Sequence, residues 1–133
     1  MRITHTAFQI STVERVDRFF GELIGLDPVR EYETDAELMK QIFGIEQGFR
    51  VRWYEIGSEI VEIFIGAFKD HRIPNSLNHI CLSVPDRKGF IQRAMGMRFR
   101  VFEKERDNKP NLIFIYDDDG NPYEIVEENP TKD

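Results

Sequence analysis

The most constraining feature of this 133-residue chain is an internal duplication. Two segments, Arg2–Ile10 and Leu77–Val84, each carry one histidine near the start, followed by apolar residues that alternate along the chain. Two later segments, Glu59–Ile65 and Asn121–Glu127, each carry one glutamate inside an apolar run. A chain that repeats one unit in this way is restricted to folds built from two similar modules.

The opening segment predicts a strand with two different faces. Side chains alternate along a strand, so Phe8 and Ile10 lie on the face opposite His5. Ser11-x-x-Glu14 matches the capping-box pattern that begins a helix, and apolar residues then recur at helical spacing as far as Gly25. We expect this helix to cover the face of Phe8 and Ile10 and to leave His5 on the uncovered face.

The remaining segments predict two modules of similar order. In the first, strands are expected at 28–33, 49–56 and 59–65, with an extra short helix at 34–43; in the second, a strand at 77–84, a helix at 85–97 and strands at 99–105, 111–116 and 121–127. The fold class is therefore α+β, with two tandem βαβββ modules at 1–66 and 77–129, a polar linker at 67–76, and one structural domain overall.

Composition excludes several classes of partner. The formal net charge is −6, whereas a nucleic-acid surface is normally basic. No apolar run approaches the roughly 20 residues of a membrane span. The single cysteine, Cys81, rules out an intramolecular disulfide and favours a reducing compartment, so we expect a cytoplasmic location.

Four residues form the candidate site: His5, Glu62, His79 and Glu124. Period-two alternation places each of them away from the bulkiest apolar stripe of its strand. If the helices cover one side of the sheet, all four share the other. A carboxylate among apolar residues costs several kcal/mol to desolvate unless it is paired or binds a metal. Two imidazoles and two carboxylates suit a divalent ion, namely Ni²⁺, Co²⁺, Zn²⁺, Mn²⁺ or Fe²⁺.

Each of these residues also has an ordinary interpretation. A single histidine or glutamate in a strand is commonly a half-exposed surface residue, and their joint occurrence at equivalent places in both repeats is what favours a site. Cys81 is expected to be a small buried residue, and turn chemistry accounts for the acidic run at 117–119. Phe49, Arg52, Trp53 and Tyr54 are candidates either for lining a hydrophobic cup or for core packing.

The residues resemble the vicinal oxygen chelate superfamily, which includes glyoxalase I, extradiol dioxygenases and bleomycin resistance proteins. The segments that carry the resemblance are THTAFQI, VDRFFGELIGLDPV, VEIF, NHICLSVPD and DDDGNPYEIVE, in this order. It implies paired βαβββ modules that form a curled mixed-sheet cup around a metal. It also implies that His5, Glu62, His79 and Glu124 occupy the four ligand positions of a glyoxalase I-like site, and that the protein is a homodimer.

The resemblance is weaker at the substrate. Glyoxalase I typically has a basic residue in the first helix, where this chain has Phe20-Gly21-Glu22, and a Lys-Gly pair where this chain has Lys109-Pro110-Asn111. These departures concern glutathione recognition and leave the ligand set intact.

Three functions are compatible with these features. The first is a metal-dependent lyase or isomerase of the glyoxalase type, acting on a small substrate with vicinal oxygens through an enediolate, with Glu124 as general base and Glu62 as the alternate base. The second is an Fe²⁺ ring-cleavage dioxygenase, against which a fourth protein ligand argues. The third is a non-catalytic protein that binds a small molecule or an antibiotic.

Overall fold

A computed structural model describes residues 1–67 and 77–128. The chain divides into two compact units, Met1–Ile73 and Pro74–Asp133. The predicted linker at 67–76 lies outside the described residues apart from Ala67. No helix of the described part is both long and apolar enough to cross a membrane.

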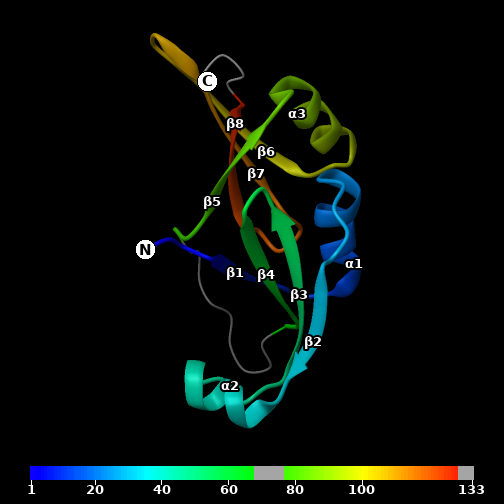
Figure 1. The fold of residues 1–133 in the computed structure, drawn as a ribbon. Coiled ribbons are helices and arrows are strands. Elements are labelled where there is room, and N and C mark those ends of the chain that lie inside the picture. The colour runs from blue at the N-terminus through cyan, green and yellow to red at the C-terminus, as the bar shows by residue number, and fades with distance from the viewer. Residues whose placement is uncertain (68–76, 129–133) are drawn as a thin grey trace. The chain divides into compact units, whose positions relative to one another are not determined.

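The first unit contains one mixed four-stranded sheet (Figure 1). Its elements are β1 (His5–Ile10), α1 (Val13–Val16), the π-helix η1 (Asp17–Leu23), β2 (Arg30–Thr34), α2 (Ala36–Phe43), β3 (Phe49–Ile56) and β4 (Glu59–Ile65). The strand order is β1-β4-β3-β2, with β1 parallel to β4 and the other neighbours antiparallel.

The second unit repeats this arrangement. Its elements are β5 (Ile80–Val84), α3 (Arg87–Gly96), β6 (Arg100–Arg106), β7 (Lys109–Tyr116) and β8 (Pro122–Glu127). The strand order is β5-β8-β7-β6, with β5 parallel to β8, as β1 is to β4 in the first unit. The predicted α+β class with two tandem βαβββ modules is therefore confirmed.

The helices bury one face of each sheet, as the alternation predicts. In the first unit the ring of Phe20 stacks on that of Tyr54, with centroids 4.8 Å apart, and Ile10 and Ile63 on the same sheet face are fully buried. In the second unit α3 buries Phe90 and Ala94. Burial of these apolar side chains is the main favourable term in folding.

The first helical segment differs from the prediction in two respects. Thr12 rather than Ser11 is the N-cap, because its hydroxyl accepts a hydrogen bond from the Arg15 amide at 3.2 Å. The segment also widens into a π-helix after one α-helical turn, and the amide of Ile24 donates to the carbonyl of Phe19, five residues back.

Candidate metal centre

The strand register places each histidine on the same sheet face as the glutamate of its own unit. In the first unit Ala7 of β1 pairs with Glu62 of β4, and His5 lies two residues before Ala7. In the second unit Cys81 of β5 pairs with Glu124 of β8. The strand predicted over 77–84 begins only at Ile80, so His79 directly precedes β5, two residues before Cys81, and its Nε2 lies 4.0 Å from Oε1 of Glu124. Because side chains two residues apart share a face, both units present one imidazole and one carboxylate with the same register.

Glu62 is a buried carboxylate with one oxygen occupied. The residue is 8% exposed. Its Oε2 accepts a hydrogen bond from the indole Nε1 of Trp53 at 2.8 Å and another from the hydroxyl of Tyr32 at 3.1 Å. Trp53 is the cross-strand neighbour of Glu62 on β3, and Tyr32 lies on β2.

The other carboxylate oxygen of Glu62, Oε1, makes no hydrogen bond within residues 1–67 and 77–128. A buried negative charge with one open oxygen is suited to bind a cation.

The two donors to Glu62 hold each other in place. The rings of Tyr32 and Trp53 pack edge to face at 6.2 Å and 77°. The guanidinium of Arg30 lies 4.7 Å from both ring centroids, a cation–π geometry. Burial raises the pKa of the Tyr32 hydroxyl, and the Glu62 carboxylate adds to this rise. The hydroxyl therefore stays protonated and donates at neutral pH.

In the second unit the imidazole of His79 lies beside Glu124. Nε2 of His79 is 4.0 Å from Oε1 of Glu124. Nδ1 lies 2.9 Å from the carbonyl oxygen of Leu77. Because a carbonyl oxygen only accepts, Nδ1 must carry a proton, and in the neutral ring Nε2 then has a free lone pair. Metal-binding histidines commonly donate their second N–H to a carbonyl in this way.

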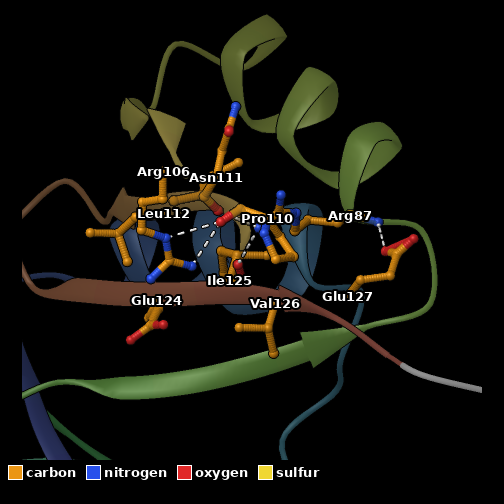
Figure 2. A pocket seen from close by; sticks show the side chains of 10 residues that line it. Arg87, Arg106, Pro110, Asn111, Leu112, Glu124, Ile125, Val126 and Glu127 are labelled. Atoms are coloured by element: carbon orange, nitrogen blue, oxygen red, sulfur yellow. Dashed lines mark hydrogen bonds between the residues drawn. The ribbon is translucent and has the colours of Figure 1, made fainter. Parts of the chain in front are cut away.

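Glu124 also lines a hollow of about 180 Å³ (Figure 2). The ladder between β7 and β8 ends at the pair of Phe114 and Glu124, and the two strands separate beyond it. The side chain of Arg87 fills part of this gap and donates to the carbonyl of Asn111 at 2.8 Å. Glu124 and Val126 lie on the same side of β8, as Figure 2 shows.

Of the four residues that could either line a cup or pack in the core, two take the packing role. Arg52 and Tyr54 lie on the helix-covered face of the sheet, whereas Trp53 lies on the face of Glu62. The guanidinium of Arg52 donates to Asp17 at 2.7 Å and to Glu31 at 2.9 Å, and this attaches η1 and β2 to β3. Because side chains alternate along a strand, the sequence alone could have placed Trp53 on one face and its neighbours 52 and 54 on the other.

Cys81 is exposed, not buried as predicted. It lies on the uncovered face of its sheet, opposite Glu124. Partial desolvation of the sulfur raises the pKa of the Cys81 thiol, although the residue as a whole is exposed, and the negative charge of Glu124 acts in the same direction. The thiol is therefore not activated as a nucleophile.

Each unit supplies one histidine–glutamate pair, and the predicted set of four takes one pair from each. Among the described residues, no group of three or more His, Cys, Asp and Glu side chains lies close enough together to hold a metal ion. The four-ligand set therefore stays a prediction.

Comparison with known families identifies the fold. The sequence model described as the Glyoxalase/Bleomycin resistance protein/Dioxygenase superfamily matches residues 2–125. The chain belongs to this superfamily. The resemblance seen in the sequence is thereby confirmed. Among curated proteins, no significant match is found.

Solved structures of the glyoxalase superfamily share the fold at low identity. A glyoxalase family protein from Bacillus cereus gives a TM-score of 0.75 at 18% identity, covering 96% of this chain and 94% of that one. The trypanothione-dependent glyoxalase I of Leishmania major gives 0.71 at 17% identity, covering 96% and 87%. A fosfomycin resistance protein from Mesorhizobium loti gives 0.62 at 20% identity, covering 98% and 94%.

Proposed function

We propose that this protein is a metal-dependent glyoxalase-like lyase or isomerase that acts on a small substrate with vicinal oxygens through an enediolate-type intermediate. The observation that carries the proposal is the open oxygen of Glu62. A carboxylate that is 8% exposed, with Oε2 held by two donors and Oε1 free of hydrogen bonds within the described residues, has the chemistry of a cation ligand.

The proposed ligands are His5, Glu62, His79 and Glu124. The neutral tautomer of His79 fits this role, because its Nε2 lone pair is free and lies beside Glu124. His5 shares its sheet face with Glu62 in the equivalent register. Mixed nitrogen and oxygen ligation favours Ni²⁺, Co²⁺, Zn²⁺, Mn²⁺ or Fe²⁺.

Such a cation, when bound, would polarise the vicinal oxygens of the substrate and stabilise the negative charge of the enediolate. Glu124 is the proposed general base. Its side chain is 28% exposed, so a small substrate can reach its carboxylate, which accepts a proton from the carbon next to the oxygens. Glu62 is the alternate base.

The first experiment measures metal content. Wild-type protein, His5→Ala, Glu124→Ala and the control Glu59→Ala are purified, loaded with Ni²⁺ or Co²⁺, and passed through a desalting column. Glu59 lies on the same strand as Glu62 but on the opposite face. We expect about one ion per chain in wild type and control, and loss of the ion in the other two variants. Wild-type protein that binds no ion would contradict the proposal and favour a binding protein without a metal.

The second experiment tests the reaction. Metal-loaded protein is mixed in deuterated water with adducts of 2-oxoaldehydes and thiols, and with 2-oxoacyl thioesters. We expect exchange or transfer of the proton next to the carbonyl, and its loss in Glu124→Gln. Oxygen uptake with catechols after anaerobic loading with Fe²⁺ would instead indicate a dioxygenase.

The proposal also includes a cytoplasmic location and a homodimeric state. The homodimer is checked by light scattering of the purified protein.

A further inference from the structure

The two candidate glutamates are equivalent in register but differ in their surroundings. Glu62 pairs across the sheet with Trp53, and Glu124 pairs with Phe114. The indole of Trp53 has an N–H that reaches Glu62, whereas the ring of Phe114 has no donor. Glu62 is buried and accepts two hydrogen bonds, while Glu124 is half-buried and accepts none within residues 1–67 and 77–128.

We propose that Tyr32 and Trp53 are positioning residues that hold Oε2 of Glu62 and thereby present its Oε1 as a fixed ligand for a divalent cation. This inference rests on the proposed function. Glu124, which has no such pair of donors, remains free to change its orientation.

The geometry supports this division. Oε2 of Glu62 accepts from one N–H and one O–H, and these two hydrogen bonds fix the orientation of the carboxylate. The edge-to-face packing of the two donor rings fixes the donors in turn. Arg30 lies over both rings and restrains them. Because Glu62 is buried, water has little access to replace a donor that is removed.

Groups that orient a metal ligand in this way contribute measurably to metal affinity. Their removal typically lowers affinity by about 10- to 100-fold. We therefore expect Trp53→Phe and Tyr32→Phe, which keep the rings and remove the donors, to weaken Ni²⁺ binding by about that factor. Tyr116→Phe is the matched control, because Tyr116 lies on the uncovered face of the second sheet and stacks under Arg100 at 3.7 Å without a hydrogen bond to Glu124.

The test titrates Ni²⁺ into each protein and measures binding by calorimetry. Trp53 is the only tryptophan of the chain, so its fluorescence gives a second reading in every variant that retains it. We expect the emission of wild-type protein to change with the same midpoint as the calorimetric signal. Tyr32→Phe should shift both midpoints to higher Ni²⁺ concentration, and Tyr116→Phe should shift neither.

A further pair of variants separates positioning from general damage to the fold. In a Glu62→Gln background, which weakens the site itself, Tyr32→Phe should cause no additional loss of affinity, since the two residues act as one unit. Circular dichroism spectra of all variants check that they are folded, and Tyr32→Phe suffices if Trp53→Phe does not fold.

Two outcomes would overturn the inference and are distinguishable. In the first, wild-type protein binds Ni²⁺, but both donor variants bind it with affinities within twofold of the wild-type value, or Tyr32→Phe causes a further loss of affinity in the Glu62→Gln background. This outcome overturns the positioning role and leaves the proposed function in place. Wild-type protein that binds no Ni²⁺, Co²⁺, Zn²⁺, Mn²⁺ or Fe²⁺ overturns the proposed function and the inference together.

Discussion

Asp117 shows how one buried carboxylate organises the turn before β8. Its Oδ1 accepts from the amides of Asp119 and Asn121, both at 3.0 Å, and its Oδ2 accepts from the hydroxyl of Tyr123 at 2.8 Å. Burial raises the pKa of Asp117, and the hydrogen bonds from Asn121 and Tyr123 oppose this rise. Asp117, the first residue of the acidic run at 117–119, therefore stabilises the turn through hydrogen bonds, which is the role in turn chemistry that the sequence predicted.

Tyr123→Phe should destabilise the protein by about 1.5–3 kcal/mol, the usual value of a hydrogen bond to a charged group. Both partners are buried, so water does not replace the lost hydroxyl. Urea unfolding measures the loss. Tyr116→Phe removes a hydroxyl on the other face of the sheet that makes no hydrogen bond within residues 1–67 and 77–128, and it should change the free energy of unfolding by much less. Equal losses in the two variants would contradict this account.

Glu31 should make stability depend on pH. Its hydrogen bond with Arg52 lowers the pKa of Glu31 in the folded state. A lowered folded pKa gives a stabilising contribution that is complete above the unfolded value of about 4.3 and is lost as pH falls through the folded value. Glu31→Gln should therefore be less stable than wild type at pH 7, and the difference should shrink below about pH 4.3.

Thermal unfolding at several pH values checks this expectation. Glu33→Gln is the control, because Glu33 lies on the same strand and face as Glu31 but does not contact Arg52. A gap between Glu31→Gln and wild type that is the same at pH 3 and pH 7 would refute the linkage.

At the scale of elements, α2 has both ends capped and most of its residues exposed. Its N-terminus is capped by Asp35, whose Oδ1 accepts from the Leu38 amide at 2.7 Å. Its C-terminus is Gly44, which adopts the left-handed conformation at φ 73°. Met39 is its buried residue, whereas Leu38 and Ile42 are exposed.

Asp35→Ala should therefore loosen α2 locally. Loss of an N-cap costs about 1 kcal/mol, which corresponds to a roughly fivefold larger population of the opened helix. Hydrogen exchange read by mass spectrometry should show faster exchange in 36–43 and unchanged exchange in β3. A uniform increase across the chain would show that α2 is coupled to global unfolding.

At the scale of the whole molecule, the duplication yields two sheets with the same strand order and two histidine–glutamate pairs in the same register. The copies differ in the residues around each glutamate: Trp53 faces one, and Phe114 faces the other. A repeated scaffold thus carries two carboxylates in different environments, and this difference suits a fixed ligand and a movable base.

Metal binding should stabilise the whole chain. A ligand that binds only the folded state at 100 times its dissociation constant adds about 2.7 kcal/mol. Differential scanning fluorimetry with Ni²⁺ should therefore show a higher melting temperature that a chelator reverses. His5→Ala and His79→Ala, one in each unit, should both abolish the shift. A shift that survives in either variant would show that this histidine is not a ligand.

The sequence by itself determined the class of fold, the bounds of β3 and β4, and the sheet face of each candidate residue. These follow from local rules: side chains alternate along a strand, and Gly57 with Ser58 marks the turn between the two strands. For the same reason, the placement of His5 and Glu62 on one face was predictable without knowledge of the register.

The tertiary structure alone decided which groups surround those residues. Tyr32 lies 30 positions from Glu62, so its hydrogen bond depends on the pairing of three strands. The ion pairs of Arg52 and the exposure of Cys81 likewise depend on which elements cover each sheet face. Alternation fixes the direction of a side chain, but the partner it meets is set by strand register, which brings distant segments together.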